Sequence, residues 1–200
     1  MQMDVGRIIP TKIFFEPHQK HLYGLQVKCG QSIPGCDYPL FHSLKGKGRH
    51  GEFPLMVVSR HFKNEGYGVL YSSSVREVSE SFICTSYPGL RRERHLHPAY
   101  ERMAQFFRLE QLEEFNAIAE QEKRKHGRKT RGGGDPDLFI YLKSDPRIHF
   151  FVEVKHKDKT HINQEIVFDL IEKHLLCRVY TIRIYSEKPR TKAETGFLQL

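Results

Sequence analysis

The chain has 200 residues, 38% of them hydrophobic, and a formal net charge of +8. This length fits one medium-sized domain with an elaboration, or one core with a small N-terminal piece. No run of apolar residues is long enough to span a bilayer and no signal-peptide pattern is present, so we expect an intracellular, cytoplasmic protein. The basic charge favours nucleic acid as a partner, although a merely solvated basic surface has the same composition.

Residues 1–50 are the least informative part of the sequence, and we treat them as an N-terminal extension of unclear structure. Residues 13–15 and 22–27 have the composition of two short strands. Glycine, proline and histidine then crowd residues 30–51, which predicts turns and loops. The cysteines lack the close ligand spacing of a structural zinc site, so we interpret them as reduced thiols: Cys29, Cys36, Cys84 and Cys177.

A helix followed by a strand is predicted over residues 52–71. Pro54 falls in the first turn of this helix, where its missing N–H is harmless. Gly66 is placed to end the helix, and residues 67–71 have the composition of a strand. A strand at residues 56–58 is the alternative to the helix.

Residues 73–133, approximately, are predicted to be an insertion that contains a strand at 81–86 and a long helix. That helix runs from Pro98 to about Lys125 and has apolar positions that include Met103 and Phe107. Basic residues and glycines follow its last turn, and they lead directly into Asp135. A contact with nucleic acid and a solvated loop fit this basic segment equally well; its cationic residues are Lys123, Arg124, Lys125, Arg128, Lys129 and Arg131.

Three charged residues lie in or beside two apolar runs, at residues 138–142 and 148–154. Asp137 precedes the first run, while Glu153 and Lys155 are two apart at the end of the second and therefore point to the same side of a strand. Charges in such a run are costly unless a metal or a counter-ion partners them. Two carboxylates suit Mg²⁺ or Mn²⁺, and a lysine beside them suits a phosphate oxygen. This combination predicts metal-assisted phosphodiester cleavage.

The last predicted elements are an amphipathic helix at residues 162–175 and a strand at 179–185. The helix repeats apolar residues with helical spacing, among them Ile166, Val167 and Leu170. The polar tail at residues 186–200 is expected to be frayed.

This order of elements, with Pro136-Asp137, then Glu153-Val-Lys155, then Gln164 on the following helix, resembles the PD-(D/E)xK nuclease superfamily, and most closely its VRR-NUC branch. The match extends over about residues 134–185, is weaker for 51–71 and is absent from the first fifty residues. The resemblance implies an α/β, restriction-endonuclease-like fold: a mixed central sheet flanked by helices, within a nuclease-like domain at residues 51–185.

The resemblance also implies roles for individual residues. Asp137 and Glu153 would be ligands of one or two divalent cations, with the Val154 carbonyl as a further ligand. Lys155 would orient or help to deprotonate the attacking water, or stabilise the charge that develops on the phosphate. Glu52 is the favoured acidic residue from the first helix, with Glu101 as its rival, and each of them also fits ordinary surface charge.

Two further polar residues flank this motif. Gln164 would bind a phosphate or a water at the edge of the site, or would be a plain polar residue on the exposed face of its helix. Asp135 is interpreted as an outer residue of the site or as a turn residue.

The function expected from these observations is Mg²⁺- or Mn²⁺-dependent hydrolysis of DNA, in repair, in recombination or in the processing of phage or mobile-element DNA. RNA stays open as a second substrate, and a homodimer is an open expectation because many enzymes of this fold cut two strands as dimers. The alternatives are a nucleic-acid-binding module without turnover, and an adaptor subunit that docks a partner through residues 1–50. Strand-edge charges that serve only solubility are the plainest interpretation of the acidic motif.

Overall fold

The computed structural model describes residues 9–29, 53–71, 105–125, 134–157 and 159–187. They form a five-stranded mixed sheet with the strand order β1-β5-β4-β3-β2. Strands β1, β5 and β4 are parallel to one another, and β3 and β2 continue the sheet in antiparallel pairs. The strands are β1 (Lys12–Phe15), β2 (Tyr67–Tyr71), β3 (Leu138–Leu142), β4 (Asp145–Lys155) and β5 (Val179–Ser186).

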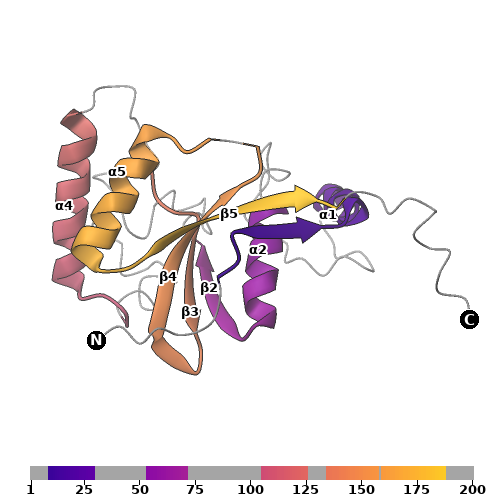
Figure 1. The fold of residues 1–200 in the computed structure, drawn as a ribbon, viewed down its shortest axis with the longest axis horizontal. Helices are drawn as coiled ribbons and strands as arrows, with labels where there is room; N and C mark the ends of the chain where they lie inside the picture. Colours follow the sequence, from indigo (N-terminus) through magenta and orange to yellow (C-terminus); the bar gives the residue numbers. More distant parts are fainter. Residues whose placement is uncertain (1–8, 30–52, 72–104, 126–133, 158, 188–200) are drawn as a thin grey trace, which may run out of the picture.

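Different helices cover the two faces of this sheet (Figure 1). Helix α2 packs on one face, whereas α4 and α5 pack on the other. The expected α/β architecture, a mixed sheet flanked by helices, is therefore confirmed. The helices are α1 (Pro17–Cys29), α2 (Phe53–Asn64), α4 (Leu109–Lys125) and α5 (Ile162–Leu170), which continues into a π-helical turn, η4 (Ile171–Leu175).

Side chains of the central strands point alternately to the two faces of the sheet and so contribute to the hydrophobic core on each face. Leu138 and Ile140 of β3 face α2, whereas Phe139 between them faces α4 and α5. All three side chains are fully buried. Burial on both faces explains why these strands are continuous apolar runs instead of alternating polar and apolar residues.

The strand predicted at residues 22–27 is wrong, because these residues belong to helix α1. Pro17 is the first helical residue, where proline is favoured. Tyr23 is buried and lies against Phe53 of α2, with ring centroids 5.5 Å apart. Packing on α2 therefore outweighs the strand propensity of a Leu-Tyr-Gly-Leu sequence.

The single long helix predicted from Pro98 to about Lys125 is also wrong, because residues 105–108 form a turn and α4 begins at Leu109; residues 98–104 lie outside the described residues. Phe106 and Phe107 both contact Phe139, with ring centroids 4.9 and 5.8 Å away. Successive residues of an α-helix point about 100° apart, so a helix would not direct both rings onto one strand. The strand predicted at residues 81–86 lies outside the described residues.

The other expected elements are confirmed. A strand is present at residues 13–15, α2 and β2 match residues 52–71, and β5 matches residues 179–185. Gly66 has a φ of +85° just after α2, the backbone conformation in which helices commonly end. The helix expected to reach Leu175 does so, but its last turn is π-helical.

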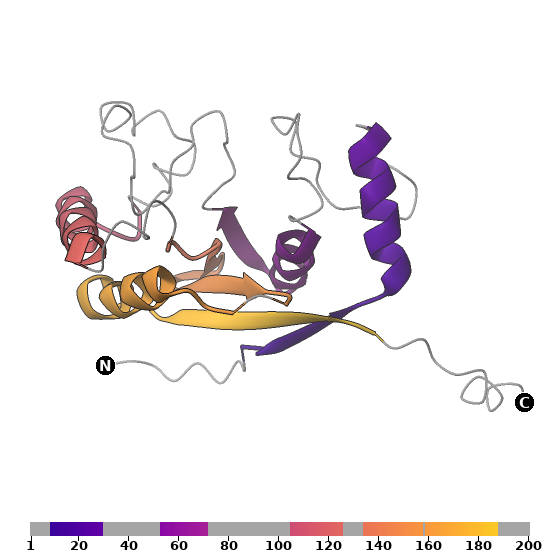
Figure 2. The same cartoon turned by 90° about the horizontal axis from the view of Figure 1, so that it is seen from above.

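The N-terminal segment contributes the outermost strand on one side of the sheet. β1 lies beside β5, and α1 extends away from the end of β1 (Figure 2). Residues assigned in the sequence to an N-terminal extension thus share a sheet with the strands that carry the acidic motif. No helix in the described part of the chain is long and apolar enough to cross a membrane.

Candidate active site

Asp137 and Glu153 lie opposite each other on neighbouring strands. Leu138 pairs with Val152 in the antiparallel register of β3 and β4. Asp137, just before β3, is therefore level with Glu153 of β4. Both acidic side chains are on the face that carries Phe139 and Phe151. The Val154 N–H donates a hydrogen bond of 2.8 Å to Asp137 Oδ2 and fixes this carboxylate against β4.

Lys155 and Gln164 complete a connected group around Glu153. Lys155 Nζ lies 2.7 Å from Glu153 Oε1 and donates a 2.8 Å hydrogen bond to Gln164 Oε1. The Gln164 side-chain amide donates to Glu153 Oε1. Gln164 also accepts a 3.1 Å hydrogen bond from the backbone N–H of His161, just before α5. The start of α5 is thereby tied to the end of β4.

Gly134 sets how closely the chain approaches α5 before it enters β3. Its φ is +108°, a conformation that other residues rarely adopt. A Cβ atom at this position would lie 2.9 Å from the Asn163 carbonyl oxygen and 3.0 Å from Val167 Cγ2. The glycine of the Gly-Asp-Pro-Asp segment therefore allows β3 and the first turn of α5 to meet beside the acidic pair.

Burial dominates the electrostatics of this group. The side chains of Glu153 and Lys155 are only 3% and 5% exposed. Burial raises the pKa of Asp137 to about 7, the negative charge of Glu153 adds to this rise, and the Val154 N–H and Lys155 oppose it. Burial also raises the pKa of Glu153, although Lys155 favours its ionised form. Two carboxyl groups are thus held side by side in a place that disfavours their charge.

The oxygen atoms at this position include donors of the kind that a divalent cation takes. Glu153 Oε2 is buried and, when both carboxyls are ionised, has no hydrogen-bond donor among the described residues. The N–H and the carbonyl of one strand residue point to the same neighbouring strand, so the Val154 carbonyl is on the side of β4 that faces β3. Hard oxygen donors of this kind are the ones that Mg²⁺ and Mn²⁺ prefer. A third side-chain ligand is missing, because no cluster of three or more His, Cys, Asp or Glu residues is found in the described part of the chain.

The structure thus brings four of the five predicted catalytic residues together: Asp137, Glu153, Lys155 and Gln164. The fifth, Glu52, and its rival Glu101 lie outside the described residues. Asp135 is half-buried in the bend before β3.

The predicted basic segment is described only in part. Arg124 and Lys125 are exposed in the last turn of α4, where Lys125 forms an ion pair with Glu122. Lys123 belongs to the same helix, and Arg128, Lys129 and Arg131 lie outside the described residues.

Residues that the sequence analysis did not assign lie beside this group on β5. Thr181 pairs with Glu153 and Arg183 pairs with Lys155 in the parallel register of β4 and β5, so their side chains are on the same face. The polar alternation of β5 was visible in the sequence. Its pairing with β4 was not, because nothing local specifies which strand a parallel partner joins.

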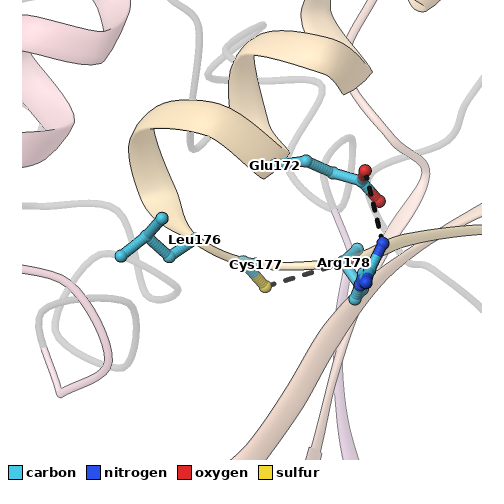
Figure 3. A pocket seen from close by; sticks show the side chains of 4 residues that line it. All are labelled: Glu172, Leu176, Cys177 and Arg178. Atoms are coloured by element: carbon cyan, nitrogen blue, oxygen red, sulfur yellow. Dashed lines mark hydrogen bonds and ion pairs between the residues drawn. The ribbon is translucent and has the colours of Figure 1, made fainter. Parts of the chain in front are cut away.

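A separate hollow of about 250 Å³ lies where η4 leads into β5, and it is lined by Glu172, Leu176, Cys177 and Arg178 (Figure 3). Arg178 Nη1 lies 3.7 Å from Glu172 Oε2. Burial raises the pKa of the Cys177 thiol to about 12, which keeps this cysteine a protonated, unreactive side chain. None of the predicted catalytic residues lines this hollow.

Neither protein-family models nor curated proteins nor solved structures gave a match to this chain. The resemblance to PD-(D/E)xK nucleases therefore depends on the motif residues and their arrangement alone. That arrangement consists of two level carboxyl groups, a lysine bonded to one of them, and a glutamine from the next helix.

Proposed function

We propose that this chain is a Mg²⁺- or Mn²⁺-dependent nuclease with a restriction-endonuclease-like fold that hydrolyses DNA phosphodiester bonds. One observation carries the proposal: Glu153 and Lys155 are almost fully buried, yet they face a second, half-buried carboxyl group at Asp137. Burying two acids and a lysine together costs free energy that an apolar cluster would not. Ionisable groups whose pKa values are shifted by burial cluster at catalytic centres, so a catalytic role would account for this cost.

Each residue of the group has a definite task in this function. Asp137 and Glu153, with the Val154 carbonyl, would hold the cation, which supplies Lewis-acid polarisation of the phosphate when bound. Lys155 lies against Glu153 and presents a positive charge to a phosphate oxygen or to the attacking water. Gln164 binds both Glu153 and Lys155 and so keeps the acid and the base in fixed relative positions.

We propose DNA as the substrate because the protein carries a positive net charge. The net charge of +8 favours a polyanion through counterion release. The basic segment that begins at Lys123 precedes Asp135 and Asp137 in the chain, and we include its cations in the proposed contact with DNA. If that segment neutralises about three phosphates, removing its charges should lower the log–log salt slope of DNA binding by roughly 3.

A second candidate is a nucleic-acid-binding module or adaptor that keeps this fold without turnover. One observation favours it: Lys155 and Gln164 already bond to Glu153 Oε1 and to each other, and no third acidic side chain joins Asp137 and Glu153 in the described part of the chain. In that case the group would be a structural ion pair, and no cation would bind.

A cleavage panel with metal titration tests the proposal. Wild-type protein is mixed with single-stranded, duplex, flapped and four-way DNA in Mg²⁺, in Mn²⁺ and in EDTA. We expect cleavage only with metal, and calorimetric Mn²⁺ binding that is lost in Asp137→Asn. Absence of both Mn²⁺ binding and cleavage would overturn the nuclease proposal in favour of the binding module.

A further inference from the structure

The sheet face that carries the acidic group continues beyond it over β5 and β1. Lys155 pairs with Arg183, and Arg183 pairs with Lys12, so three cationic residues lie in a row across three strands. Neighbouring strands lie about 4.8 Å apart, which makes the row on the order of 10 Å long. We name the accessible part of this face the β1–β5 platform; it consists of the exposed residues Lys12, Phe14, Thr181 and Tyr185 and the half-buried Arg183.

Two aromatic rings form the centre of the platform. Phe14 and Tyr185 are cross-strand partners with ring centroids 5.7 Å apart and an interplanar angle of 32°. Phe14 is 58% exposed and Tyr185 is 37% exposed, although the residues on either side of Phe14, Ile13 and Phe15, are buried. Single exposed apolar residues are common and need no explanation, whereas two adjoining exposed rings beside a row of cations are a candidate contact surface for a partner.

Charge decides which partner this surface fits. Lys12 and Arg183 form no ion pair with a described residue, so both are available to an anion. The acidic residues Glu16 and Glu187 come directly after the two strands and bound the platform at its far end. Aromatic rings among cations suit unpaired nucleotides, whose bases stack while their phosphates contact the cations. In a duplex the bases are already stacked and paired, so their faces are not available to the rings.

We propose that the β1–β5 platform binds an unpaired nucleic-acid strand next to the acidic group. This inference rests on the proposed nuclease function and specifies its substrate class: DNA with a single-stranded segment adjoining the bond that is cut. Phe14 and Tyr185 stack on bases, and Lys12 and Arg183 contact the phosphates that lead toward Lys155. Continuity of the face from Lys155 through Arg183 gives the strand a path to the site.

The test measures binding in EDTA, where cleavage is not required. Fluorescence anisotropy follows a labelled oligo-thymidylate strand bound to wild type and to Phe14→Ala, Phe14→Leu, Phe14→Trp and Tyr185→Ala. Stacking predicts about a tenfold loss for each alanine and for Phe14→Leu, with Phe14→Trp close to wild type. Leu176→Ala is the matched control, because Leu176 is 83% exposed and lies outside the platform.

The cations give a second readout. Replacing Lys12 and Arg183 by glutamine should lower the log–log salt slope for the single strand by about 0.7 for each phosphate contact that is lost. Phe14 and Tyr185 are both exposed, so the Phe14 and Tyr185 variants should keep the wild-type circular dichroism spectrum and melting temperature.

Two results would overturn the proposal. The first is unchanged oligo-thymidylate affinity in the Phe14→Ala/Tyr185→Ala double variant. The second is a wild-type dimer that becomes a monomer in that variant by light scattering, which would assign the face to a second copy of the chain. Failure of the nuclease proposal is a distinct outcome: no substrate would be cut, yet the ring variants would still weaken binding of the single strand.

Discussion

Strand β4 carries two pairs of an acid and a base with identical spacing, one near each end. Asp145 and Arg147 are at its start, and Glu153 and Lys155 are at its end. Arg147 Nε and Nη2 each lie 2.8 Å from a different oxygen of Asp145, and the Arg147 side chain is 77% exposed. Glu153 and Lys155 are 2.7 Å apart and are almost completely buried. The difference between the pairs is therefore their environment.

The two acids respond in opposite directions. The hydrogen bond from Arg147 lowers the pKa of Asp145, as expected for an acid beside a cation in water. Burial raises the pKa of Glu153 even though Lys155 is in direct contact. An ion pair in water is nearly neutral for stability, whereas a buried one costs free energy. The contrast supports our proposal that the inner pair is a functional group, whereas the outer pair has the properties of ordinary surface charge.

The largest expected effect is on cleavage. Asp137→Asn and Glu153→Gln each remove the charge of a carboxylate that we propose as a metal ligand, but keep the shape of the side chain, so the rate with Mg²⁺ should fall by about 10³-fold or more. Initial rates on the best substrate of the cleavage panel measure this. Asp145→Asn is the matched control on the same strand and should retain the wild-type rate. A rate near wild type in Asp137→Asn would sink the assignment of the site.

The next effect is on folding stability. Lys155→Met leaves the Glu153 charge buried without its cation, so unfolding in EDTA should be easier by about 3–5 kcal/mol. Glu153→Gln/Lys155→Met should recover much of this loss, because no charge then remains unpaired. Urea denaturation measures all three proteins. Equal stability of wild type and Lys155→Met would contradict this prediction, because it would mean that water or a structural rearrangement solvates the Glu153 carboxylate in the variant.

The third effect is a dependence of stability on pH. The raised pKa of Asp137, about 7 against 3.8 for the ordinary group, means that the folded protein holds a proton that the unfolded chain has released. The contribution of Asp137 is therefore fully present below about pH 4 and is lost as the pH rises to about 7. The free energy of unfolding of wild type, minus that of Asp137→Asn, should fall over this range in EDTA. A difference that stays constant with pH would contradict the raised pKa.

The smallest effect concerns the outer pair. Asp145→Asn and Arg147→Gln should leave the urea midpoint unchanged within error at neutral pH, because exposed ion pairs often contribute nothing measurable. The measurement is repeated at low and high salt, since any remaining contribution should be screened. A clear loss of stability in Arg147→Gln would contradict the prediction that the exposed pair at the start of β4 contributes little to stability.

Local patterns in the sequence predicted the part of the fold that carries the site. The apolar runs that became β3 and β4 were legible because both of their faces are buried. Their charged ends are conspicuous for the same reason, so the sequence predicts Asp137, Glu153 and Lys155 as residues of the site. Gln164 belongs to the group because α5 begins beside β4, which its position in a periodic helix did not establish.

The errors arose where tertiary packing overrides local preference. Residues 22–27 look like a strand, but Tyr23 packs on Phe53 of α2 and the segment is helical. Phe107 fits a helical repeat, yet it lies in a turn because it and Phe106 both pack on Phe139. The β1–β5 platform was not foreseen either, because it depends on the pairing of two strands that are distant in the sequence.

The pairing of β1 with β5 also bears on the order in which the chain folds. β3 and β4 are joined by a tight turn, so they can pair early and at little entropic cost, whereas β1 must close a loop that contains most of the chain. During synthesis β1 leaves the ribosome long before its partner exists. The hairpin of β3 and β4 should therefore gain protection from hydrogen exchange first, and the β1–β5 platform should be the last part of the sheet to assemble.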